Sequence, residues 1–207
     1  MKKHFHAPPK AIEVSSQRPV VLRTVEAEPG KAVMEVGIEY SKAQVPERSY
    51  YADYCEIERG RTGLSFFFGK LVPGTSKLRT KIEIAFPDEM VLKQLWYSSR
   101  NFHDTVRKTA ELFNLEPVEQ VEDTDKVQTF RANNVLMAAW GEEAVMDFYY
   151  LCPRDVHQAP KVARTEVDLE PIVRVVLSTA LIFEFLEKCR PHIERLKSAG
   201  VLQPQEI

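Results

Sequence analysis

The sequence predicts an α+β protein made of two tandem βββα units, each an antiparallel sheet covered by a long helix, behind an N-terminal β-hairpin. Two observations lead to this class. Runs rich in β-branched and aromatic residues alternate with polar positions, and a helical spacing of apolar residues follows the third run of each unit. The same order then recurs further along the chain. We therefore expect the units to form a pseudo-dimer within one chain, with further homodimerisation as an option.

The N-terminal part begins with an arm and continues as a hairpin. Residues 1–18 combine several prolines with few apolar residues, which predicts a mobile arm. The runs Val20–Val25 and Ala32–Tyr40 flank a turn signal at Pro29 and Gly30, and this pattern is typical of two antiparallel strands.

The first unit follows with a second hairpin and a third strand. Tyr54–Glu58 alternates, and Leu64–Val72 returns as an aromatic-rich strand. Lys81–Phe86 alternates again, and Pro87 opens a helix with acids in its first turn. Apolar residues spaced three and four apart from Leu92 onward predict a long helix that buries one narrow stripe.

The second unit repeats this order. Ala52 falls on Ala132 at a shift of 80 (132 minus 52), and Ile82 falls on Val173 at a shift of 91, so 11 residues are inserted before the third strand. Its helix is expected to begin after Ser178, a good N-cap, and to kink or restart at Pro191.

A stretch with five acids and no base until Lys126 suits a linker between the units. The predicted boundaries are therefore a mobile arm at 1–18, the hairpin plus first unit at 19–115, an acidic linker at 116–126, the second unit at 127–200 and a tail at 201–207.

The first unit resembles a known family of small bacterial proteins, domain of unknown function DUF3467. The resemblance covers about Tyr51 to Phe102. It lies in Tyr51–Tyr54, in Phe66–Lys70, and in Lys81–Glu89 leading into the helix. The second unit matches more weakly, and its insertion departs from the compact family form. The resemblance implies an architecture, and the family name implies no activity.

Composition favours an ordinary globular chain in a reducing compartment. Of 207 residues, 44% are hydrophobic and 28% are charged, and the formal net charge is -2, so no global charge indicates nucleic acid or an anionic membrane. Three widely separated cysteines suit free thiols better than disulfides. Without an apolar signal-peptide core or a membrane-spanning run, we expect a bacterial cytoplasmic protein.

Alternation along the second unit leaves an apolar outer sheet face, which the first unit, the hairpin or a second subunit is expected to cover. The first functional hypothesis is therefore a non-enzymatic interaction or scaffold protein that acts through sheet and helix surfaces. The predicted interface residues are Leu136, Trp140, Val145, Tyr149, Ile172 and Val176.

The alternative is a single-stranded nucleic-acid-binding protein, because ten bases against four acids lie between Arg59 and Lys108. Tandem four-stranded sheets followed by helices are similar in form to PUR and Whirly proteins, in which bases stack on sheet aromatics beside basic residues. The candidate residues are Arg59, Arg61, Phe67, Lys70, Lys77, Arg79 and Lys81. A solvated basic face is the simpler interpretation.

Catalytic, metal and cofactor sites are not predicted. His4 with His6 and Cys152 with His157 are poor ligand sets, and Cys55 and Cys189 fall on core faces. Phosphate-binding loops and nucleophile elbows are missing from the sequence. An enzyme whose site is assembled from scattered residues remains the third hypothesis.

Overall fold

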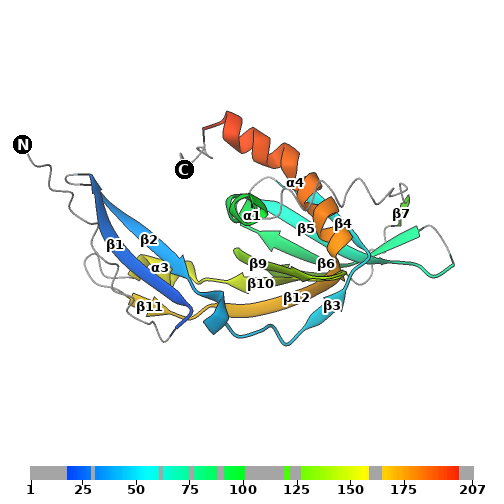
Figure 1. Cartoon of the computed structure of the whole chain (residues 1–207), viewed down its shortest axis with the longest axis horizontal. Helices are drawn as coiled ribbons and strands as arrows, with labels where there is room; N and C mark the ends of the chain where they lie inside the picture. The colour runs from blue at the N-terminus through cyan, green and yellow to red at the C-terminus, as the bar shows by residue number, and fades with distance from the viewer. Residues whose placement is uncertain are drawn as a thin grey trace, which may run out of the picture.

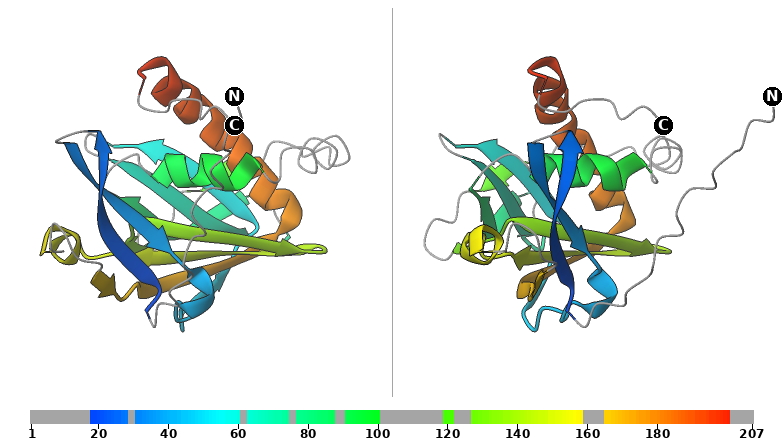
Figure 2. Two further views of the ribbon diagram at one scale, coloured as in Figure 1. Left: turned by 60° about the vertical axis from the view of Figure 1, so that its left-hand side comes forward. Right: turned by 90° about the vertical axis from the view of Figure 1, so that its left-hand side faces the viewer.

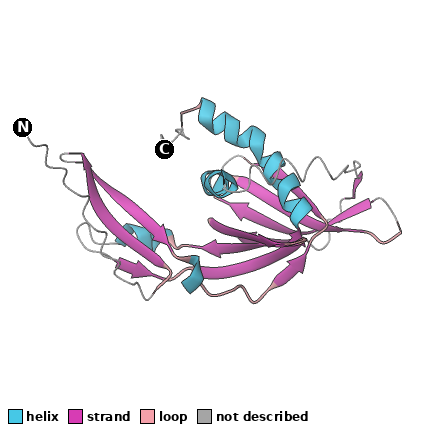
Figure 3. Cartoon of the chain, in the orientation of Figure 1, coloured by secondary structure: helices cyan, strands magenta, loops and turns pink. Residues whose placement is uncertain are grey.

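The protein has a mixed α+β fold in which most strand pairs are antiparallel (Figures 1 and 3). The coarse class predicted from the sequence is therefore confirmed. The architecture below is that of a computed structural model. It describes residues 18–28, 31–60, 63–74, 77–87, 91–100, 119–121, 127–158 and 165–200.

The N-terminal hairpin forms sheet A, with the strand order β11–β1–β2. Its strands are β1 (Val20–Glu28), β2 (Lys31–Ile38) and β11 (Thr165–Val167). β11 pairs only with the first residues of β1, Val20 to Leu22. The rest of the hairpin therefore extends away from the other sheets as a two-stranded ribbon (Figure 1).

Sheet C holds the strands of the first predicted unit. Its order is β4–β5–β6–β7, and β8 also pairs with β6. The strands are β4 (Tyr54–Arg59), β5 (Leu64–Leu71), β6 (Lys77–Phe86), β7 (Glu119–Val121) and β8 (Gln128–Arg131). β7 lies within the stretch expected as a linker, and β8 was not expected.

Sheet B holds the strands of the second predicted unit in the order β3–β12–β10–β9. The strands are β3 (Ser49–Tyr51), β12 (Glu170–Ser178), β10 (Glu143–Tyr150) and β9 (Asn134–Trp140). The short β3 pairs in parallel with β12 and was not expected either.

The chain passes between sheets B and C twice. After β3 it enters β4, and the N–H groups of Ala52 and Asp53 bond to one carbonyl in each sheet, Val176 and Gly69, both at 2.9 Å. After β8 it enters β9, and the second crossing is held in the same way. Its bonds run from Ala132 N–H to Ala85 O at 3.1 Å and from Asn133 N–H to Tyr149 O at 3.0 Å.

Each long helix packs against an edge strand of the sheet that it does not directly follow. α1 (Val91–Arg100) follows β6 of sheet C but contacts β9 of sheet B. α4 (Thr179–Ser198) follows β12 of sheet B, and its main strand contact is β4 of sheet C. Figure 2 shows α1 and α4 lying together above sheet B.

Two further short elements are η1 (Tyr40–Lys42) and α3 (Pro153–Gln158). α4 begins as expected, because the Ser178 hydroxyl accepts the Leu181 N–H at 3.1 Å. It does not restart at Pro191 but continues to Ser198. Pro191 lacks only one N–H group, and the apolar contacts of the buried Cys189 and Ile193 hold the helix on either side of it.

One core lies between the inner faces of sheets B and C and the two helices. Phe148 of β10 is fully buried, with its ring centroid 5.9 to 6.5 Å from those of Phe66, Phe68 and Phe86 of sheet C. Phe185 of α4 completes the group, at 4.9 Å from Phe66 and 5.9 Å from Phe68. Alternation along the predicted strands places Phe66, Phe68, Ile82 and Phe148 on the core face, and all four are buried. Met137, expected on the core face of the second unit, is only partly buried.

Some expectations concern residues outside the described ranges. Residues 1–17 of the expected arm, most of the linker at 116–126, the helix beyond Arg100 and the tail at 201–207 fall there. Arg18, the last residue of the expected arm, lies 3.6 Å from Asp168, beside sheet A. The 11 residues expected to be inserted before the third strand fall within 154–170, which contains most of α3 and all of β11, so a substantial part of this stretch is regular structure.

We predict that Phe148→Ala destabilises both sheets together. Loss of the ring removes its contacts with Phe66, Phe68 and Phe86 of sheet C, and a buried Phe→Ala change costs about 3–5 kcal/mol. Urea denaturation followed by circular dichroism should show one transition at lower urea for the variant. Val45→Ala, at a side chain that is 58% exposed, is the control and should leave the midpoint almost unchanged. Two separated transitions would contradict a shared core.

Candidate functional site

The outer face of sheet B carries large hydrophobic side chains that are exposed. Tyr51, Val176, Val145 and Ala138 lie opposite one another on the consecutive strands β3, β12, β10 and β9, and Trp140 is two residues beyond Ala138. We call these residues the apolar row. The two ends of the apolar row are the most exposed, with Tyr51 at 65% and Trp140 at 58%.

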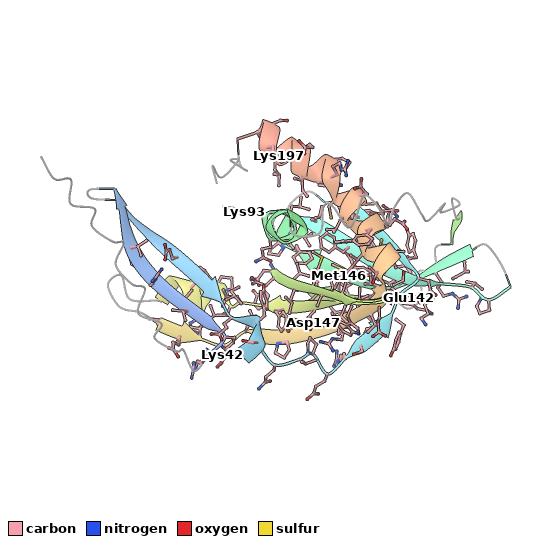
Figure 4. All side chains as sticks on the ribbon, viewed as in Figure 1. Lys42, Lys93, Glu142, Met146, Asp147 and Lys197 are labelled. Carbon is pink, nitrogen blue, oxygen red and sulfur yellow. The ribbon has the colours of Figure 1, made fainter. Side chains whose placement is uncertain are left out.

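The centre of the apolar row is buried but is not part of the protein's core. Val145 and Val176 are 5% and 8% exposed, yet neither belongs to the two core clusters formed by the described residues. They lie between the exposed rings of Tyr51 and Trp140. Glu142, in the turn after Trp140, marks the end of sheet B away from the hairpin (Figure 4). The result is a short apolar strip with an aromatic ring at each end.

An ion pair lies in the next row of the same face. The Arg174 guanidinium donates two hydrogen bonds to the Asp147 carboxylate, both at 2.6 Å. The bonds to Asp147 raise the pKa of Arg174. Asp147 is 3% exposed, and its neighbour Met146 leaves β10 toward the core (Figure 4). Because this bidentate pair satisfies both groups and cross-links β10 to β12, its role is structural.

The N-terminal hairpin covers the other end of the face. Val20 and Leu22 of β1 form a second core cluster with Tyr149. The Tyr40 ring lies 5.8 Å from the Tyr149 ring, and burial raises the pKa of both phenols to about 12. The expectation that the hairpin covers this apolar face is therefore correct for this end, and the apolar row is the part that it leaves open.

The predicted interface residues consequently have different environments. Trp140 is exposed, Val145 and Val176 are buried within the apolar row, and Tyr149 lies beneath the hairpin. Leu136 is partly buried against the hairpin cluster. Ile172 packs against the main core, because a register shift at Phe148 leaves it without a strand partner and interrupts the alternation.

Sheet C has an equivalent row with a different chemistry. Arg131, Ala85, Ser65 and Glu58 lie opposite one another on β8, β6, β5 and β4, with the same pairing as the apolar row. Arg131 and Glu58 are exposed, and Ser65 donates a hydrogen bond to Glu83 at 2.8 Å. The fold itself therefore accepts polar residues at these positions.

Phe67, the predicted base-stacking residue, lies between two carboxylates. Its direct neighbours across β4 and β6 are Glu56 and Glu83. Glu83 also accepts a hydrogen bond from Thr129 at 2.9 Å. A nucleotide stacked on Phe67 would bring its phosphates close to these negative charges, which opposes binding.

The predicted basic residues are spread along sheet C rather than grouped around Phe67. Arg59 lies opposite Leu64, whereas Lys70 and Arg79 face each other six residues further along β5, about 20 Å away. Lys81 falls in the β6 bulge and is half-buried. Arg61 and the Lys77 side chain lie outside the described parts of the chain. Arg59 thus lies at the opposite end of sheet C from Lys70 and Arg79, and Lys81 lies two residues from Glu83, which faces Phe67.

The cysteines resemble structural residues rather than nucleophiles. Cys55 and Cys189 are buried, and burial raises the pKa of both thiols. Cys152 is partly exposed. Within the described residues, no group of three or more His, Cys, Asp and Glu side chains could hold a metal ion. No described helix is long and apolar enough to cross a membrane.

Sequence reasoning missed Tyr51 as a member of the apolar row. β3 is only three residues long, so it has too few positions to show alternation, and in the sequence Tyr51 stands out only through the family resemblance. The exposure of Tyr51 depends on the parallel pairing with β12, which joins residues 125 positions apart (176 minus 51). Local pattern alone does not contain this pairing.

Comparisons of the chain with protein-family models, with curated proteins and with solved structures find no match. The resemblance to DUF3467 therefore stays an expectation, neither supported nor refuted.

We predict that the native protein has one rapidly reacting thiol. A thiol-specific disulfide reagent at pH 8 should modify Cys152 quickly, whereas Cys55 and Cys189 should react only after denaturation, because both are buried and stay protonated. Cys152→Ser is the matched control and should abolish the rapid phase. Rapid modification of Cys55 in that variant would contradict the described packing of β4 against α4.

Proposed function

We propose that the chain is a pseudo-dimer of two βββα units that acts as a non-enzymatic protein-interaction module. The repeated strand registers support the pseudo-dimer. Adding 80 to the residue numbers of β4 and β5, and 91 to those of β6, gives the positions of β9, β10 and β12, which pair in the same order. The short parallel strand is β8 beside β6 and β3 beside β12, and adding 80 to β3 gives a position within β8. The register shift after Phe68 recurs after Phe148.

Contacts between equivalent residues also support a two-fold relationship. Tyr50 and Phe130 are separated by 80 residues, and their ring centroids are 6.1 Å apart. Phe68 and Phe148, also separated by 80, are 5.9 Å apart. Equivalent residues meet at a two-fold axis, as they do across a symmetric dimer interface.

The contrast between the two outer faces carries the functional proposal. At equivalent positions, sheet C has Arg131, Ala85, Ser65 and Glu58, whereas sheet B has Tyr51, Val176, Val145 and Ala138. Since the polar set is compatible with this pairing, the exposed rings of Tyr51 and Trp140 need a reason other than the fold. Contact with another molecule supplies that reason.

The chemistry of the apolar row suits a protein partner. Trp and Tyr are the residue types that most often dominate the binding energy of protein interfaces, and here one stands at each end of a buried aliphatic centre. Lys70 lies 5.5 Å from the Tyr51 ring and provides a charged rim. The partner that fits is a different protein presenting aliphatic side chains to a flat face. Nucleic acid is less suitable because Phe67 is flanked by carboxylates.

Site-specific photocrosslinking in the native host tests this proposal. A photoreactive amino acid replaces Ala138 in the apolar row, and in a matched control it replaces Glu58, the equivalent position of sheet C. We predict a discrete crosslinked species with another protein from position 138, which disappears when Trp140→Ala and Tyr51→Ala are added.

Equal crosslinking from positions 58 and 138 would contradict the proposal, because it would indicate nonspecific contact. A product with twice the mass of the chain would place a second copy on this face and would also contradict it. A salt-sensitive fluorescence-anisotropy signal with single-stranded DNA or RNA, lost in Phe67→Ala, would favour the nucleic-acid alternative.

A further inference from the structure

We propose that β2 of one chain pairs with β2 of a second copy, which joins two A sheets into one continuous sheet across a homodimer. The inference is independent of the apolar row. β2 is an edge strand, because the described strands of sheet A have the order β11–β1–β2. Glu35, Val36 and Gly37 of β2 are exposed, and Val36 is 46% exposed.

Most of the hairpin lacks a third strand. β11 supports β1 only from Val20 to Leu22, and the paired residues from Arg23 to Glu28 extend beyond it. Figure 1 shows this ribbon reaching away from sheets B and C. An isolated two-stranded ribbon is marginally stable in water, and three or more strands are usually needed. A strand added at the β2 edge would supply the missing pairing.

Helix side chains engage other sheet edges in this protein. On β4, the Lys188 ammonium donates to the Cys55 carbonyl at 2.6 Å. On β9, the Val135 N–H donates to the Gln94 side-chain oxygen at 3.2 Å. These two positions are equivalent under the shift of 80. Side chains that bond to edge backbone groups block the addition of another strand there, whereas β2 is exposed along Glu35–Gly37.

The sequence of β2 is self-complementary in one antiparallel register. Pairing centred on Val33 places Lys31 of each copy opposite Glu35 of the other. Within one chain, Arg23 pairs with Glu35 and Glu28 pairs with Lys31. The joined sheet therefore has a row Arg23, Glu35, Lys31, Glu28, in which the last two residues belong to the second copy and the charges alternate.

This register also matches the uncharged positions. Val25 pairs with Val33 in each chain, so an apolar row runs across the centre of the joined sheet, between two charge-alternating rows. Moving the centre by two residues to Glu35 would place the two Glu35 residues opposite each other, and opposed like charges are destabilising. Charge complementarity thus selects a second copy as the occupant of this edge.

Sedimentation velocity on the full chain tests the proposal with a charge exchange. The wild type should show a concentration-dependent rise in mass from 23.8 kDa toward twice that value. Lys31→Glu and Glu35→Lys should each weaken self-association by about tenfold, because both opposed pairs become like charges. An equimolar mixture of the two variants should recover the dimer, since both pairs opposed across the dimer are again of opposite charge.

Glu142→Lys, in the exposed turn of sheet B, is the control and should dimerise like the wild type. Circular dichroism of each variant checks that the fold is intact, and recovery in the mixture excludes misfolding as the cause of a loss. A wild type that stays monomeric at several hundred micromolar would overturn the proposal. Dimerisation unaffected by either variant, or a mixture without recovery, would overturn it as well.

Discussion

Phe148 of β10 contacts Phe66, Phe68 and Phe86 of sheet C, and the rest of the structure depends on this meeting of two sheets. The chain crosses between the sheets at Ala52 and at Ala132, and each long helix packs on the edge of the sheet that it does not directly follow. Neither half encloses its own apolar residues. The hydrophobic free energy of folding is therefore gained mainly when both halves are in place.

This arrangement leaves the outer faces free to differ. The inner positions of both sheets are committed to one core, whereas the outer positions need only tolerate the strand pairing. On sheet C the outer positions hold charged and hydroxyl side chains. On sheet B the outer positions hold the Asp147–Arg174 ion pair, Tyr149 in contact with the hairpin, and the apolar row. Two sheets that share one core can therefore carry unlike outer surfaces without disturbing the packing of their inner faces.

Local pattern predicted the strands and the inner faces well, because alternation reports burial on one side of a sheet. Phe66, Phe68, Ile82 and Phe148 were assigned correctly for this reason. Local pattern did not predict the strands whose pairing partners are distant in the sequence. β3, β7 and β8 are three or four residues long and obtain their hydrogen bonds from strands far along the chain. The burial of Tyr149 and the position of Ile172 likewise depend on the hairpin and on a bulge, which no periodicity reveals.

The central claim is that sheets B and C share one cooperative core, and native-state hydrogen exchange measured by mass spectrometry tests it most directly. Amides of β5 in sheet C and of β10 in sheet B should exchange with the same opening free energy, equal to that of global unfolding. Added urea should lower both values in parallel. If β5 opens at a clearly lower free energy than β10, or the reverse, the two sheets unfold separately and the claim is contradicted.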